Sequence, residues 1–275
     1  MHIQIGYDIE LNVNAPTMLL GALNVHPSRQ HDLLAPEVLR TEPALPIDQY
    51  RDAFDNVITR IVVPFGTPSI RITNSATVRD SGELDEINPQ ARQVPLAELP
   101  AETLQFLLPS RYCEVDSELL GFAWNQFGYI ESGWERVRAI CAYVNQHIRF
   151  DYMQARANRT ALEGWREQVG VCRDFSHLAI TLCRAMNIPA RYTTGYLGDI
   201  GIPPMPPPMD FSAWFQVYLG DKWYTFDARH NRTRIGRIVM AIGRDAADVP
   251  ITMVFGPNSL ARFEVISDEL AEVQV

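Results

Sequence analysis

The spacing of the apolar residues changes along this chain, and that change most limits what the chain can fold into. Up to about residue 110, apolar and polar residues alternate in short runs such as 3–9 and 69–73, or form a β-branched run at 57–63. Breakers such as the Gly-Thr-Pro at 66–68 separate the runs. The pattern predicts an N-terminal antiparallel β-sandwich or barrel domain over residues 1–110.

A helical spacing replaces this alternation after a proline-containing linker that extends to about residue 118. Apolar residues then recur at spacings of three and four from Val137 to Ile148, and Ser132 with Glu135 predicts a capping box at the start of this helix. A second helix is predicted to begin near Cys172 and to stop before Pro189.

Strand-like runs return in the last third of the chain. They lie at 190–197, at 213–219 and 222–227 joined through Gly-Asp, and at 235–242, 251–255 and 260–266. Helices followed by antiparallel strands predict an α+β domain over residues 119–275.

The charge balance bears on the choice of partners. With 24 Lys and Arg against 33 Asp and Glu, the 275 residues carry a net charge of -9, so no broad basic surface is expected for nucleic acid or anionic lipid. No apolar run is long enough to span a bilayer, and the first residues do not have the pattern of a secretory signal. We therefore expect a cytoplasmic protein with no nucleic-acid or membrane partner, and the oligomeric state stays open.

One of the four cysteines lies where a helix is predicted to begin. The four are widely spaced without a Cys-x-x-Cys pair, and no ligand cluster or Gly-rich phosphate loop is visible, so we expect free thiols and no metal or cofactor. At a helix N-terminus, free N–H groups and the helix dipole stabilise a thiolate and a developing oxyanion. Cys172 is therefore a candidate nucleophile, and a small buried thiol is the alternative.

Several sequence blocks around this cysteine follow one another in a fixed order. They are GVCRDFSHL at 170–178, NIPARY at 187–192, Gly195-Tyr196, AWFQVYL at 213–219 and WYTFD at 223–227. In order and spacing, these blocks resemble the bacterial transglutaminase-like superfamily over residues 130–230. The preceding β segment is similar to the N-terminal β domain often attached to bacterial members.

The resemblance implies a papain-like α+β core with a Cys-His-Asp triad. In such a site the cysteine attacks a glutamine or peptide carbonyl and forms a thioester, which water or an amine resolves. By position, Cys172 matches the nucleophile and Asp227 matches the residue that orients the base. The family usually reads His-Ala-Trp where this chain has Ser212, and a serine hydroxyl cannot replace imidazole as a base near neutral pH.

His230 is the replacement base that we propose from the sequence, because a turn after the strand could fold its ring toward the cleft. The alternative is an exposed turn histidine. A structural role is expected for His177 and His147. The predicted substrate-binding residues are Tyr152, Trp165, Trp214 and Ser212, with core packing as the alternative for the aromatic ones.

The sequence thus favours a transglutaminase-like thiol enzyme, of the cysteine peptidase or amidase kind, that cleaves or transfers peptide or amide bonds through a Cys172 thioester. Hydrolysis is favoured over cross-linking, and the expected partner is a peptide or protein substrate. The alternative is a catalytically degenerate peptide-binding or scaffold module, which the serine at position 212 favours.

Overall fold

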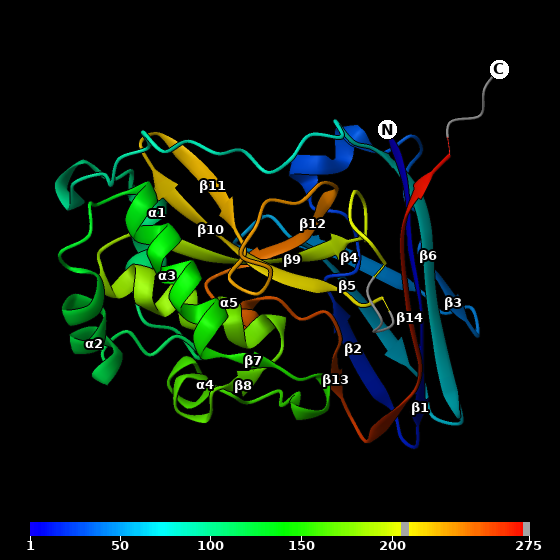
Figure 1. Cartoon of the computed structure of the whole chain (residues 1–275). Helices are drawn as coiled ribbons and strands as arrows, with labels where there is room; N and C mark the ends of the chain where they lie inside the picture. Colours follow the sequence, from blue (N-terminus) through cyan, green and yellow to red (C-terminus); the bar gives the residue numbers. More distant parts are fainter. Residues whose placement is uncertain (205–208, 272–275) are drawn as a thin grey trace.

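Two four-stranded antiparallel sheets form one end of the molecule in the computed structural model, which describes residues 1–204 and 209–271 (Figure 1). One sheet has the order β14-β1-β6-β3 and the other β13-β2-β5-β4. Their strands are β1 His2–Val13, β2 Thr17–Gly21, β3 Arg40–Glu42, β4 Ile47–Arg51, β5 Val57–Val63, β6 Ser69–Arg79, β13 Met253–Phe255 and β14 Asn258–Leu270.

The alternation in the sequence explains why these sheets pack together. In β1 each odd-numbered residue is buried, from Ile3 to Val13, and joins a core with side chains of β2, β5 and β6 such as Leu19, Ile61 and Ile70. Strand residues point alternately to the two faces, so alternating apolar residues supply one continuous apolar face. The expected N-terminal β region is confirmed.

The last two strands belong to these sheets. β14 pairs with β1 along its whole length, from His2 opposite Leu270 to Val13 opposite Asn258, and β13 pairs with β2. The prediction that the whole of 119–275 forms the second domain is wrong for these two strands. Partners some 250 residues apart leave no local trace in the sequence, so their pairing is decided only by the folded chain.

A third antiparallel sheet, with the order β11-β10-β9-β12, forms the centre of the molecule (Figure 1). Its strands are β9 Ala190–Leu197, β10 Ser212–Leu219, β11 Lys222–Phe226 and β12 Arg237–Gly243. The predicted strand at 190–197 and the hairpin through Gly220 and Asp221 are confirmed.

Helices cover one face of this central sheet (Figure 1). They are α1 Ala101–Leu104, α2 Glu118–Phe127, α3 Trp134–His147, α4 Ala161–Glu167 and α5 Cys172–Ala185. Short 3-10 helices lie at Pro27–Asp32, Leu96–Glu98, Gln105–Leu107, Tyr152–Gln154 and Ala246–Asp248. α5 packs against α2, α3, α4, β9 and β10, and nearly all of its residues are buried.

The start of α3 differs from the prediction. Its N-cap is Gly133 and not Ser132, and no side chain caps it. Gly133 has a φ of 98°, and a Cβ there would lie 2.5 Å from the carbonyl oxygen of Ala91. The same oxygen accepts a hydrogen bond from the Trp134 N–H. The close approach of the linker therefore decides the cap, and only glycine permits it.

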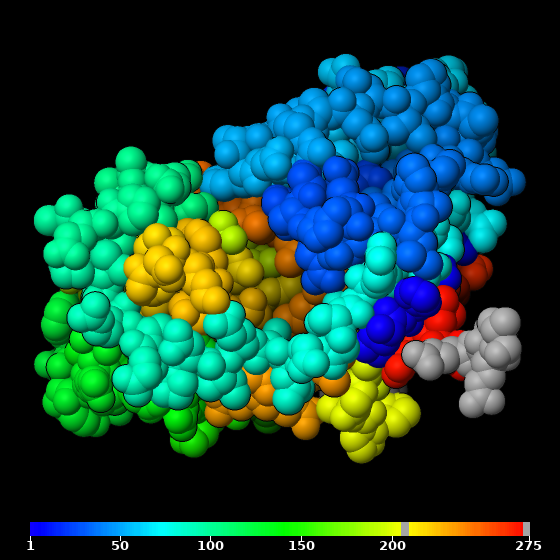
Figure 2. All heavy atoms as spheres, turned by 90° about the horizontal axis from the view of Figure 1, so that it is seen from above, coloured from blue at the N-terminus to red at the C-terminus, as the bar shows by residue number. Residues whose placement is uncertain are grey.

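The linker crosses the surface beside the β10–β11 hairpin. Figure 2 shows this segment in turquoise next to the hairpin in gold, and the Gly220 N–H donates to the Arg92 carbonyl at 2.8 Å. Across the described residues, no helix is long and apolar enough to cross a membrane.

Candidate active site

Cys172 is the first residue of α5, and a buried ion pair fixes the start of that helix. The Asp174 carboxylate accepts a hydrogen bond from the Val171 N–H at 2.8 Å and another from Arg159 Nη1 at 2.9 Å. Both charged side chains are almost fully buried. Asp174 therefore caps the helix start, and the cap holds Cys172 in position.

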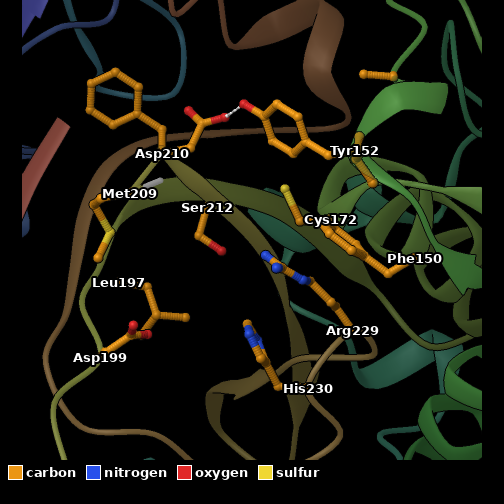
Figure 3. Close-up of a pocket in the computed structure, with 13 residues that line it drawn as sticks. Phe150, Tyr152, Cys172, Leu197, Asp199, Met209, Asp210, Ser212, Arg229 and His230 are labelled. Carbon is orange, nitrogen blue, oxygen red and sulfur yellow. Dashed lines mark hydrogen bonds between the residues drawn. The ribbon is translucent and has the colours of Figure 1, made fainter. Parts of the chain in front are cut away.

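Cys172 is partly exposed in a pocket of about 140 Å³, whereas Cys113, Cys141 and Cys183 are buried (Figure 3). The pocket brings together residues of α5, β9, β10 and the turn after β11. They are Phe150, Tyr152, Ala155, Val171, Cys172, Leu197, Asp199, Met209, Asp210, Phe211, Ser212, Arg229 and His230. Four of the seven predicted site residues, Tyr152, Cys172, Ser212 and His230, therefore meet in one place.

The environment of the thiol has two opposing effects. Burial raises the pKa of Cys172, while the positive charge of Arg229 and a hydrogen bond from the Ala213 backbone lower it, and burial has the larger effect. The effect of burial therefore opposes the stabilisation of the thiolate that is predicted for the helix start. Since the neutral thiol is favoured, the site needs a base.

Asp227 and His230 form a buried dyad at the end of β11. His230 Nδ1 lies 2.8 Å from Asp227 Oδ2, and Arg237 Nη2 donates to the same oxygen at 2.9 Å. Burial alone would raise the pKa of Asp227, but Arg237 and His230 outweigh it and the pKa lies below its ordinary value. An ionised carboxylate only accepts hydrogen bonds, so Nδ1 of His230 carries a proton and points to Asp227.

The turn that follows Asp227 directs His230 inward. Asp227 Oδ1 accepts a hydrogen bond from the His230 N–H at 2.9 Å, and Asn145 Nδ2, on α3, donates to the carbonyls of Ala228 and Arg229 at 3.1 and 2.7 Å. The His230 side chain is only 8% exposed, so the alternative of an exposed turn histidine is wrong. Its Nε2 is buried and makes no hydrogen bond within residues 1–204 and 209–271.

Ser212 begins β10 at the position where the family usually has histidine. Its Oγ is buried and has no hydrogen-bond partner in the described part of the chain. In Figure 3 the Ser212 side chain points toward the Arg229 guanidinium, which lies between Ser212, Cys172 and His230 in this view.

The predicted aromatic residues separate into two groups. Tyr152 lines the pocket, and its hydroxyl donates to Asp210 Oδ2 (Figure 3). Trp214 is 1% exposed with Arg237 over its ring, and Trp165 donates its Nε1–H to the Tyr143 hydroxyl. Neither tryptophan is among the described residues that line the pocket. Both therefore fit the alternative of core packing instead of substrate binding.

Three residues around the site were missed by sequence reasoning. Arg229 lines the pocket beside His230, Asp210 pairs with Tyr152, and Arg237 completes the contacts of Asp227. Arg229 and Asp210 could have been found, because each lies within three residues of a predicted site residue. Arg237 had no such signal, since it reaches Asp227 from the start of β12, at the opposite edge of the central sheet from β11.

Histidines outside the pocket have other surroundings. His177 is fully buried, its ring stacks on Tyr112, and its Nε2 accepts the Ala246 N–H at 3.1 Å. Burial holds its pKa well below the ordinary value, so the ring is neutral, as expected of a structural histidine.

Among the described residues, no group of three or more His, Cys, Asp or Glu side chains is arranged to hold a metal ion.

Comparison with known proteins places this geometry in a family. The family model of the transglutaminase-like superfamily matches residues 123–228, which include Cys172, Ser212 and Asp227. A solved structure from Cytophaga hutchinsonii, named as a candidate cysteine protease, is 30% identical and superposes with a TM-score of 0.86 over 100% of this chain and 92% of that one. This chain belongs to the transglutaminase-like superfamily.

The likeness extends over both parts of this transglutaminase-like chain. The Cytophaga structure covers the N-terminal sheets as well as the helices and the central sheet. An uncharacterised protein of Mycobacterium leprae is 22% identical over 240 residues, which are 83% of each chain. The expected α+β fold, with an N-terminal β region before a transglutaminase-like core, is confirmed, and the protein belongs to a family of thiol enzymes.

Proposed function

We propose that this protein hydrolyses amide or peptide bonds, with Cys172 as the nucleophile and His230 as the base. The observation that carries the proposal is the Asp227–His230 dyad, whose 2.8 Å hydrogen bond leaves Nε2 unpartnered in the pocket that holds Cys172. It supplies an imidazole to a site in which the family position of the base is a serine. The Cytophaga relative, named as a candidate cysteine protease, is consistent with this chemistry.

In the first half of the reaction, His230 Nε2 takes the proton of the Cys172 thiol as the sulfur attacks the carbonyl carbon. The C–N bond then breaks, and the leaving amine takes that proton from the imidazolium. The product is a thioester on Cys172. Free N–H groups at the start of α5 and the Ala213 N–H are donors for the oxyanion that forms on the carbonyl oxygen.

In the second half, water attacks the thioester carbonyl and loses a proton to His230 Nε2. The C–S bond breaks, the sulfur takes the proton back, and a carboxylic acid leaves. We propose water as the acceptor because it needs no binding surface of its own, whereas an amine acceptor does.

The test follows the acyl-enzyme and the product. The protein is mixed with N-acyl amino-acid p-nitrophenyl esters and p-nitroanilides, with and without butylamine, and the mass of the intact protein is measured before and after hydroxylamine, which cleaves thioesters. We expect a hydroxylamine-sensitive adduct on Cys172 and release of the free acid. Release of the butylamide as the main product would instead identify a transferase.

Variants assign the two roles. Cys172→Ala removes the attacking sulfur and should abolish both adduct and turnover. His230→Ala should slow turnover by about 10²–10⁴-fold, the usual contribution of a general base. His31→Ala, which removes an exposed histidine that does not line the pocket, is the control and should leave turnover unchanged. Unchanged rates in Cys172→Ala would rule out the proposed function.

A second candidate function rests on Ser212. A member of the family that has lost its usual base could retain the pocket as a peptide-binding module. In that case the wild type is inactive, Cys172→Ala binds peptides as tightly as the wild type, and Ser212→His raises turnover strongly because it restores the usual triad.

A further inference from the structure

Arg229 occupies the centre of the pocket and has a rigid base. Its backbone carbonyl accepts a hydrogen bond from Asn145 Nδ2 at 2.7 Å, which ties the turn to α3. Its guanidinium carbon lies 3.9 Å from the centre of the Phe150 ring. Stacking on one face fixes the plane of the guanidinium and leaves its N–H edge available to a planar acceptor.

The charge of Arg229 has no protein carboxylate to pair with. Over the described ranges, 1–204 and 209–271, no Asp or Glu oxygen lies within ion-pair distance of its guanidinium, and the guanidinium donates no hydrogen bond to a protein group. Its charge nevertheless lowers the pKa of the Cys172 thiol and of the Asp210 carboxyl, which shows that it acts on both sides of the pocket.

The two carboxylates that face Arg229 in or beside the pocket each have another hydrogen-bond partner. The Asp210 carboxylate accepts the Tyr152 hydroxyl, and burial raises its pKa. The Asp227 carboxylate is paired with Arg237 and His230. The pocket therefore presents a fixed, partly buried cation next to the nucleophile, and a carboxylate is the ligand that a guanidinium binds in two parallel hydrogen bonds.

We propose that Arg229 binds a carboxylate of the substrate, so that the enzyme prefers amides that carry a free carboxylate close to the scissile bond. This inference rests on the proposed function, because it assigns the substrate class of the same site. Arg229 is then a specificity-determining residue.

The test compares two reagents that differ only in charge. Iodoacetate and iodoacetamide both alkylate Cys172, with formation of the S–C bond and loss of iodide, but only iodoacetate carries a carboxylate. The rates are measured at one pH by mass spectrometry, and their ratio is compared with that of glutathione. The ratio cancels any change in the thiolate fraction, since that fraction affects both reagents equally.

We expect the iodoacetate-to-iodoacetamide ratio at Cys172 to exceed that of glutathione by about tenfold or more, as for a charge-assisted hydrogen bond. Arg229→Met should reduce the ratio to that of glutathione, and Arg229→Lys should retain part of the preference. The matched control is Arg149→Met, which removes an exposed arginine that does not line the pocket. A wild-type ratio equal to that of glutathione would overturn the inference, as would an unchanged ratio in Arg229→Met.

A second measurement separates failure of this inference from failure of the proposed function. Binding of N-benzoylglycine and of N-benzoylglycinamide to the Cys172→Ala protein is measured by calorimetry, which needs no thiol chemistry. A thiol that resists both alkylating reagents would count against the proposed function, and the calorimetry would then decide the inference. The inference is supported if N-benzoylglycine binds more tightly than N-benzoylglycinamide and this difference is lost in Cys172→Ala/Arg229→Met. Equal affinities of the two compounds for the Cys172→Ala protein overturn the inference.

Discussion

At the scale of residues, the site depends on how the charged groups are distributed around one thiol. Asp227 is held ionised by Arg237 and His230, and Arg229 has no carboxylate partner in the described chain. Burial raises the pKa of Cys172, whereas the positive charge of Arg229 lowers it. The opposing effects on the thiol lead to a prediction about pH.

Alkylation of Cys172 by iodoacetamide should increase with pH through a midpoint above the ordinary cysteine pKa of about 8.5. The sign follows from burial, which disfavours the thiolate and raises the pKa of Cys172 more than Arg229 and the Ala213 N–H lower it. Peptide mass spectrometry gives the rates, and the buried thiols of Cys113, Cys141 and Cys183 should not react in the folded protein. A midpoint well below the ordinary value would mean that the helix start and Arg229 dominate over burial.

At the scale of elements, α5 is positioned by its first turn. Gly170 allows this turn, because a Cβ there would lie 2.6 Å from the Asp174 side chain, and Asp174 in turn caps the helix and pairs with Arg159. Sequence alone predicted the helix and the cysteine at its start. It did not show Arg159, which approaches from the segment before α4.

Asp174→Ala should lower the free energy of unfolding by about 3–5 kcal/mol, since it leaves a buried arginine without this carboxylate and removes the acceptor of the Val171 N–H. Urea unfolding measures the loss, and Asp174→Asn, which keeps an acceptor but not the charge, should fall between. Glu135→Ala, which breaks an exposed ion pair on α3, should change stability by about 0–1 kcal/mol. Equal losses in Asp174→Ala and Glu135→Ala would show that the buried pair does not hold the helix start.

At the scale of the whole molecule, the C-terminal strand connects the β-sandwich to the pocket. Gly198 follows β9, and a Cβ on it would lie 2.1 Å from the carbonyl oxygen of Ser267 in β14. Its neighbours Leu197 and Asp199 line the pocket. The strand that pairs with β1 along one sheet therefore also packs against the edge of the candidate active site.

Gly198→Ala should therefore destabilise the protein and reduce turnover together. The new Cβ meets backbone, which cannot move away as a side chain can, so we expect a loss of about 1–3 kcal/mol or more. Gly121→Ala is the control, because a Cβ there meets no atom within 4 Å on an exposed helix position. Thermal unfolding and the esterase rate are measured on the same samples, and a Gly198→Ala protein as stable and active as Gly121→Ala would contradict the coupling.

The sequence by itself determined the α+β class, the central strands and helix α5, and the positions of Cys172 and Asp227 within a family pattern. These features are local, because the period of apolar residues and the spacing of a motif are properties of neighbouring residues. Only the tertiary structure decided that β14 returns to β1, that His230 turns inward onto Asp227, and that Arg229 stands unpaired beside the thiol. Each of these depends on contacts between segments far apart in the chain, such as α3 with the turn after β11, and no local pattern encodes such contacts.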